Sequence, residues 1–159
     1  MKVSEVMTAP PVTVAPDVRL AEAARRMAEA AVGSVVVVDG EGVLVGVVTD
    51  RDIALRGLGG GLDRNAAVDA VMSDRVVTVD AGDDLQAAYR AFRRTGVRRL
   101  PVLELGRVVG VLTVDDLFLD VFRRLADLLG PVARTVLQEP SGRDCAGGTS
   151  QAGSSSATG

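Results

Sequence analysis

The sequence predicts an α+β protein made of two tandem repeats, each with the element order β-α-β-β-α. The heptapeptide Gly-Val-Val-Thr-Asp-Arg-Asp at 46–52 returns 64 residues later as Gly-Val-Leu-Thr-Val-Asp-Asp at 110–116. Two shorter runs ahead of each heptapeptide repeat as well: Val6-Met7-Thr8 with Val71-Met72-Ser73, and Val12-Thr13-Val14 with Val77-Thr78-Val79. A single unit of about 60 residues buries too little surface to be comfortably stable alone. We therefore expect the copies to pack about a pseudo-twofold axis, as small mixed sheets flanked by helices.

The first repeat, residues 1–61, contains these elements in order. The β-branched run 12–14 lies between prolines and predicts a strand. Asp17 is the expected N-cap of a helix with an apolar stripe at helical spacing, made of Leu20, Ala23, Ala24, Met27 and Ala31. Residues 35–38 and 43–48 predict a hairpin around an Asp-Gly-Glu-Gly turn. A short helix from Asp50 to Leu55 should end at Gly57.

Residues 57–61 form a glycine-rich run that we interpret as a flexible connector between the repeats. A phosphate loop is the alternative. It would need a glycine where Leu62 stands, a preceding strand, or a Gly-Lys-Ser/Thr sequence, and this run has none of them.

The second repeat, residues 62–130, follows the same order and ends in a longer apolar helix. Asp83 or Asp84 should cap its first helix, and residues 100–103 and 107–112 repeat the strand pair. The final helix carries apolar residues at helical spacing, namely Phe118, Val121, Phe122, Leu125, Leu128 and Leu129, with Leu117 and Leu119 widening the stripe. A subunit interface and a simple core explain this width equally well. Gly130-Pro131 predicts the end of the helix.

The tail, residues 131–159, is expected to be largely disordered. A short helix over 132–139 precedes a segment, 140–159, of Gly, Ser, Ala and Thr with almost no large apolar residue.

Composition excludes several classes of function. The chain has 47% hydrophobic and 25% charged residues, which is ordinary for a globular protein of one domain or two very small ones. One Tyr, three Phe and a net charge of -3 argue against a nucleic-acid partner, since such proteins use aromatic stacking and clustered Lys and Arg.

The chain lacks His and its one Cys, Cys145, lies in the tail, so we expect neither a Ser-His-Asp or Cys-His site nor a structural zinc site. Without a signal-peptide run or a span of about 18 apolar residues, we expect a cytoplasmic protein that does not enter the membrane.

Two tandem units that begin Val-Met-Thr/Ser, continue Val-Thr-Val and end Gly-x-x-Thr-x-x-Asp resemble a pair of CBS domains, the Bateman module. The resemblance covers about residues 3–125. It implies a regulatory module that binds adenosine-containing ligands, such as AMP, ADP, ATP or S-adenosylmethionine, in clefts between the repeats. No tightly held cofactor is implied.

The repeated motif has a physical rationale of its own. A carboxylate can accept hydrogen bonds from the vicinal hydroxyls of a ribose, and a threonine hydroxyl at a helix start can donate to a phosphate oxygen. The glycine would allow a ligand or another backbone to approach closely. The structural alternative is that Thr49-x-x-Asp52 and Thr113-x-x-Asp116 are capping boxes of their own helices. The two roles can coexist.

The resemblance also implies that the motif of one repeat works with the first strand and the pre-strand residues of the other. The first cleft would hold Thr49, Arg51, Asp52, Val77, Thr78, Arg98 and Arg99, whose arginines suit phosphate recognition. The second, weaker cleft would hold Val12, Thr13, Ser34, Thr113 and Asp116, next to Gly33. It has no comparable cation, and Asp115 stands where the first motif has arginine. We therefore expect phosphate preference in the first cleft, and in the second either no ligand or an uncharged adenosine group. For Arg98-Arg99 a solvated surface pair is the alternative.

Three classes of function remain. The favoured one is a homodimeric regulatory module that binds an adenosine-containing ligand without catalysis and signals to an unknown effector protein. The alternative is a ligand-free dimerisation or docking protein in which the motifs are only helix caps. An enzyme has little support, because no nucleophile-base pair or metal cluster is apparent.

Overall fold

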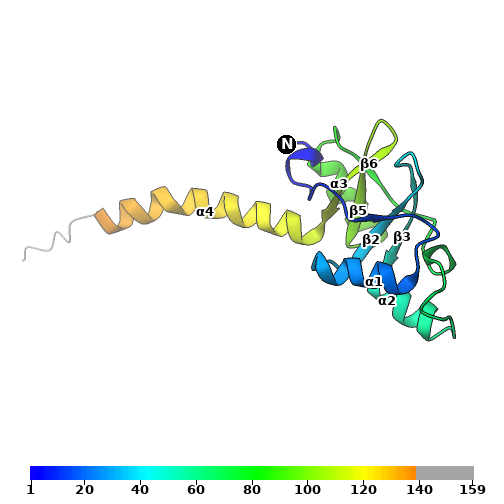
Figure 1. Ribbon diagram of the computed structural model, residues 1–159. Coiled ribbons are helices and arrows are strands. Elements are labelled where there is room, and N and C mark those ends of the chain that lie inside the picture. Colours follow the sequence, from blue (N-terminus) through cyan, green and yellow to red (C-terminus); the bar gives the residue numbers. More distant parts are fainter. Residues whose placement is uncertain (139–159) are drawn as a thin grey trace, which may run out of the picture. The chain divides into compact units, whose positions relative to one another are not determined.

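The structure is a computed structural model that describes residues 1–138, and side-chain burial through residue 132 (Figure 1). It contains two compact units, Met1–Arg123 and the part from Arg124 onward. The first unit holds both repeats and the beginning of the last helix. The predicted tail segment 139–159 lies outside the described residues.

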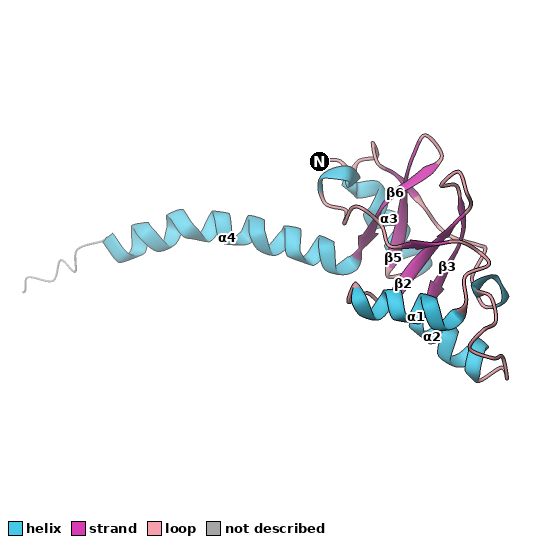
Figure 2. Ribbon diagram, in the orientation of Figure 1, coloured by secondary structure: helices cyan, strands magenta, loops and turns pink. Residues whose placement is uncertain are grey.

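Each repeat forms a three-stranded sheet with its helix on one face (Figure 2). In the first, β1 (Thr13–Val14) pairs parallel with β2 (Ser34–Val38), which pairs antiparallel with β3 (Leu44–Thr49). In the second, β4 (Val79–Asp80), β5 (Arg99–Glu104) and β6 (Arg107–Thr113) repeat this topology. Helices α1 (Leu20–Glu29) and α3 (Leu85–Thr95) are the crossovers. The predicted α+β fold with mixed sheets is confirmed.

Two short 3-10 helices join the repeats, because each one packs on the hydrophobic core of the repeat to which it does not belong in sequence. Val3 of η1 (Val3–Glu5) is fully buried in the second core, beside Leu100 and Leu112. Val68 of η3 (Val68–Ala70) is fully buried in the first core. Residues 1–7 and 62–72 therefore belong in space to the partner repeat, so the predicted boundary at 61 divides the chain but not its cores.

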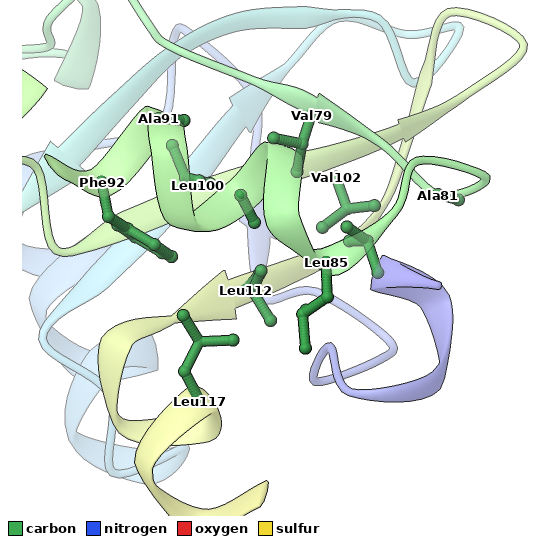
Figure 3. Packing of buried hydrophobic residues seen from close by; sticks show 11 residues of the cluster. Val79, Ala81, Leu85, Ala91, Phe92, Leu100, Val102, Leu112 and Leu117 are labelled. Carbon is green, nitrogen blue, oxygen red and sulfur yellow. The ribbon is translucent and has the colours of Figure 1, made fainter. Parts of the chain in front are cut away.

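The two cores are made of aliphatic side chains between each helix and its sheet. Figure 3 shows the second, where Leu85 and Phe92 of α3 lie over Leu100, Val102 and Leu112 of the sheet. The first core contains mainly Val, with Leu20, Ala23 and Met27 from α1. Burying such side chains contributes roughly 1.5–3 kcal/mol each, which is the main term that holds the helices on the sheets.

The motif glycines serve the packing of the swapped segments. A Cβ at Gly46 would lie 2.7 Å from Met72 Sδ and 2.9 Å from the Ser73 carbonyl oxygen. A Cβ at Gly110 would lie 2.5 Å from Met7 Sδ and 3.0 Å from the Thr8 carbonyl oxygen. The expectation that a glycine lets another backbone approach is thus met by the partner repeat's own segment.

Helix α1 is shorter than its sequence pattern predicts. Its N-cap is Arg19, without a side-chain capping bond, so the assignment of Asp17 as the cap is wrong. The first backbone N–H groups, of Leu20 and Ala21, donate instead to carbonyls of Ala66 and Arg64. Backbone carbonyls at the start of the second repeat's sequence therefore cap this helix. Ala31, expected in the stripe, lies beyond the helix with φ of 52°.

The helix after β3 is longer than predicted. It begins as α2 (Asp50–Asp52) and continues as a wider π-helix, η2 (Ile53–Leu58). Gly57 does not end the helix but lies within η2, where it is buried. A Cβ there would lie 3.1 Å from Leu20 Cδ1, so this glycine allows close packing against α1. The flexible connector is thereby reduced to 59–61, and Leu62 packs against the first core.

Helix α4 (Val114–Gln138) continues through Pro131, so the predicted stop at Gly130-Pro131 and the separate helix after it are wrong. A proline removes one backbone donor but does not oblige a helix to end. Leu117 is buried in the second core, whereas Phe118, Val121 and Phe122 are at least half exposed. Leu125, Leu128 and Leu129 are also exposed. The simple-core interpretation of this stripe is therefore wrong for these residues.

Candidate functional site

The first predicted cleft exists, with a volume of about 350 Å³. Among its lining residues are Thr49, Asp52, Val77, Arg98 and Arg99, all expected from the sequence. The motif of repeat 1 thus meets the pre-strand residues of repeat 2. Val47, Ser73, Arg75, Val76 and Val97 also line it.

Two of the expected residues are elsewhere. Arg51 is exposed on α2 and is not among the residues that line the cleft, because the first turn directs this position away from the capping face. Thr78 lines a neighbouring groove instead. Since Asp115, the counterpart of Arg51, is also exposed and does not line the second cleft, this pair does not distinguish the clefts.

Thr49 and Asp52 form a capping box at the start of α2. The Asp52 N–H donates to Thr49 Oγ1 at 3.0 Å, while Asp52 Oδ2 accepts from the Thr49 N–H at 2.9 Å and the Thr49 hydroxyl at 2.8 Å. The hydroxyl proton of Thr49 is therefore used within the capping box. It does not point toward a phosphate site, although the sequence suggested that it could. The box fixes the carboxylate in place, and its capping role is confirmed.

The other carboxylate oxygen of Asp52 accepts no hydrogen bond from the described residues. Its nearest charged neighbour is Arg56, whose Nε lies 3.7 Å from Asp52 Oδ1. Arg56 also donates to the Val71 carbonyl at 3.2 Å, so it is held by the swapped segment. Sequence reasoning missed this cation. Its position four residues after the aspartate, on the same helical face, could have indicated it.

The second cleft is much smaller, about 100 Å³. Val12, Ser34 and Thr113 line it as predicted, with Pro10 and Pro11 among the other walls. Thr13 does not line it and belongs to β1. Asp116 is not among the lining residues, but its Oδ2 accepts the same pair of bonds from Thr113, at 2.8 Å each.

Asp116 differs from Asp52 in its second oxygen. Asp116 Oδ1 accepts from the Thr8 hydroxyl at 3.4 Å, so both its oxygens have protein donors. At the equivalent place in the first cleft stands Ser73, whose oxygen accepts from Arg56 at 3.5 Å. The two motifs form the same capping box, but only Asp52 keeps a carboxylate oxygen that accepts no hydrogen bond from the described residues.

The prediction that the second cleft has no cation is wrong, since Arg99 lines both clefts. Its side chain crosses over Gly33, where a Cβ would lie 3.1 Å from Arg99 Nη2. The reason is that strand register fixes only the backbone of Arg99, whereas its long side chain reaches across the interface between repeats.

No described helix has the length and apolar character needed to cross a membrane. Within residues 1–138, no three His, Cys, Asp or Glu side chains gather in a way that could hold a metal ion.

Comparison with known proteins agrees with this architecture. Residues 3–58 and 68–122 each match the family model of the CBS domain. A CBS domain-containing protein, YhcV, from Bacillus subtilis is 37% identical over 115 residues, covering 72% of this chain and 81% of that protein. Hypoxic response protein 1 from Mycobacterium tuberculosis is 33% identical over 114 residues, covering 71% and 80%.

Solved structures are similar over the same region. A structure of Hypoxic Response Protein I with two coordinated zinc ions has a TM-score of 0.69 and 31% identity, covering 74% of this chain and 96% of that one. A CBS domain protein from Pyrobaculum aerophilum complexed with AMP has a TM-score of 0.67 and 29% identity, covering 73% and 89%.

Proposed function

Because the chain belongs to the CBS domain family, with one domain in each repeat, we propose that it is a regulatory module that binds an adenine nucleotide of the AMP type in its first cleft. The module signals through a change in conformation or stability and performs no catalysis. The observation that carries this proposal is the Asp52 carboxylate oxygen that accepts no hydrogen bond from the described residues, in a cleft lined by three arginines.

The first cleft suits such a ligand in size and charge. Its volume of about 350 Å³ falls within the roughly 300–1,000 Å³ typical of small-molecule sites, and the second cleft falls below this range. Arg75, Arg98 and Arg99 would bind the phosphate, and Asp52 Oδ1 would accept from a ribose hydroxyl. The apolar walls from Val47, Val77 and Val97 would hold the base. A relative solved with AMP supports the nucleotide class.

The second cleft is proposed as the weaker site. Asp116 already accepts a bond at both oxygens, so a ribose there would have to displace Thr8. Arg99 is its one lining cation among the described residues. We expect it to be empty when the first cleft holds its ligand, since the same arginine would serve both.

Calorimetric titration with AMP tests the proposal, with Asp52→Ala compared against Asp116→Ala. Both variants lose a capping box and should lose similar stability, about 1 kcal/mol. AMP affinity should fall at least about tenfold in Asp52→Ala alone, because a charge-assisted hydrogen bond is lost. Adenosine, titrated in parallel, should bind more weakly than AMP to the wild type.

The alternative, a ligand-free docking protein with purely structural caps, makes the opposite prediction. No heat with AMP, ADP, ATP or S-adenosylmethionine would favour it, as would equal effects of the two aspartate variants. Turnover of AMP or ATP by the purified protein would instead support the third class of function, an enzyme.

We also propose that the exposed apolar residues of α4 form an interface with a second copy of the chain. Phe118, Leu119, Val121 and Phe122 are 50–65% exposed on one helix, and monomers rarely leave such contiguous apolar surface open. Phe122→Glu should convert a dimer into a monomer in light scattering after gel filtration. Leu105→Glu, at a residue 96% exposed in the β5–β6 turn, should leave the dimer intact. A wild type that is monomeric, or a Phe122→Glu dimer, contradicts this.

A further inference from the structure

A second basic depression lies beside the first cleft and is lined by residues of α3 and of the segment 77–79. Its volume is about 550 Å³, larger than either cleft. It is lined by Val77, Thr78, Val79, the small residues Ala87 and Ala91, three arginines, Arg90, Arg93 and Arg94, and Asp83. We call it the α3 groove. Val77 lines both the α3 groove and the first cleft, so the two adjoin.

The three arginines of the α3 groove are exposed and have no ion pair or side-chain hydrogen bond with any residue in the described part of the chain. Asp83, the groove's carboxylate, accepts from the Asp80 backbone N–H at 3.0 Å. Three guanidinium groups within little more than one helical turn repel one another unless an anion lies between them.

The first repeat provides an internal control, because α1 and α3 match at an offset of 65 residues. In α1, Arg26 donates to the Thr13 carbonyl of the edge strand at 3.0 Å and pairs with Glu22 at 3.1 Å. Arg25 pairs with Glu22 and with Glu29, both at 2.8 Å. The charges of this face are neutralised within the chain, and Arg26 covers the strand.

The second repeat lacks the carboxylates that pair with arginine in α1. Ala91 stands at the position of Arg26, and Ala87 at that of Glu22. Arg90 keeps the place of Arg25, but its second partner, Glu29, is replaced by Arg94. The face of α1 whose charges are paired within the chain therefore corresponds in α3 to an open groove, whose arginines have no ion pair among the described residues.

The floor of the groove contains the outer edge of the sheet, where no further described strand pairs. One backbone donor of β4, the Asp80 N–H, is already used by Asp83 Oδ2. Strand β4 is the terminal strand of its sheet and pairs only with β5 among the described strands. An unpaired strand edge can accept an extended peptide as an added strand. In repeat 1, the Arg26 side chain occupies the corresponding edge.

We propose that the α3 groove docks an extended, acidic segment of a partner protein along the edge of β4, with its carboxylates on Arg90, Arg93 and Arg94. A peptide fits better than a nucleic acid, because Asp83 would repel a continuous phosphate backbone whereas a peptide can place an apolar residue there. Among the groove's lining residues there is also no aromatic side chain on which a base could stack. This docking needs no nucleotide in the first cleft.

Fluorescence anisotropy with a labelled peptide of alternating Glu and Val, about eight residues long to match one strand, tests the proposal on the full chain without AMP. Arg90→Glu/Arg94→Glu should weaken binding at least about tenfold. Arg64→Glu, a single charge reversal on an exposed loop residue, should leave it unchanged. Ala87→Glu/Ala91→Arg, which rebuilds the two pairs of Glu22 and the arginine over the strand edge in repeat 1, should also weaken binding. Thermal unfolding of each variant checks that it is folded.

The proposal is overturned if the peptide does not bind at low salt, or if it binds the Arg90→Glu/Arg94→Glu variant as tightly as the wild type. It is also overturned if a thymidine oligonucleotide of equal length binds more tightly, which would indicate a nucleic-acid site. If the peptide and the oligonucleotide bind equally tightly and inorganic triphosphate displaces both completely, the groove is a simple anion site and the proposal is wrong. Because AMP is absent throughout, none of these results bears on the nucleotide site.

Discussion

At the level of single residues, the motif combines a glycine for packing with a threonine-aspartate pair for capping. Gly46 and Gly110 admit the sulfur of Met72 and Met7, while Thr49 and Thr113 hold a carboxylate rigidly at the start of the next helix. The difference between the two clefts arises one step away, from Arg56 beside Asp52 and Thr8 on Asp116. Two motifs with the same Gly-x-x-Thr-x-x-Asp pattern can thus differ in their capacity to accept a hydrogen bond from a ligand's hydroxyl.

Gly46→Ala should lower the free energy of unfolding by about 1–3 kcal/mol, because the new methyl would overlap Met72 and the Ser73 carbonyl. The carbonyl is backbone and cannot move aside like a flexible side chain. Gly40→Ala is the matched control, since nothing lies within 4 Å of its Cβ position. Urea unfolding measures both. Equal stability of the two variants would show that the close approach has no energetic weight.

At the level of elements, α1 and α3 have the same fold position and different electrostatics. The hydrogen bonds from Arg25, and then from Arg26, lower the pKa of Glu22, and the same pairing raises the pKa of Arg25. Arg26 in turn joins this network to β1 through the Thr13 carbonyl. The network therefore links the helix to the edge strand in the first repeat, where the second repeat has an open groove.

Glu22→Gln gives a pH-dependent test of this link. A carboxylate whose pKa is lower in the folded state stabilises the fold above its unfolded value, 4.5, and loses that contribution as pH falls through the folded value. The wild type should thus be more stable than Glu22→Gln at neutral pH, and the difference should shrink below pH 4.5. Urea unfolding across pH measures it. A difference that is constant with pH would exclude the ionised network, and because the groups are exposed the effect should also weaken with salt.

Over the whole molecule, the exchange of η1 and η3 makes the two repeats one folding unit. Val3 and Val68 are each fully buried in the core of the opposite repeat. Met1–Arg123 form a single compact unit that contains both repeats. A change in one core should therefore be felt by the other.

Val3→Ala and Val68→Ala should each destabilise the protein by about 2 kcal/mol, through lost burial and a cavity. The one tyrosine, Tyr89, packs against the second core and supplies a local fluorescence probe. If folding is cooperative, Val68→Ala in the first core should shift the Tyr89 transition as far as the circular dichroism transition. Val43→Ala, at a residue 41% exposed, should shift neither. Separate transitions would show that the repeats unfold independently.

The sequence alone determined the repeated topology, because local periodicity specifies strands and helices, and a motif found twice in one order specifies a pseudo-symmetric pair. The resemblance to CBS domain pairs also implied one cleft for Thr49, Asp52, Val77, Arg98 and Arg99, and the structure brings these residues together. The sequence could not predict the capping of α1 by Ala66 and Arg64 or the reach of Arg99 into both clefts, since these depend on contacts between residues far apart in the chain. Proline and glycine signals failed at Gly57 and Pro131 for a related reason: local propensity is worth about 1–3 kcal/mol, and packing or helix continuity can exceed it. Tertiary structure therefore decided which oxygens and cations have partners within the described residues, because such contacts join distant parts of the chain, and the proposed binding sites rest on the groups that it leaves without hydrogen bonds.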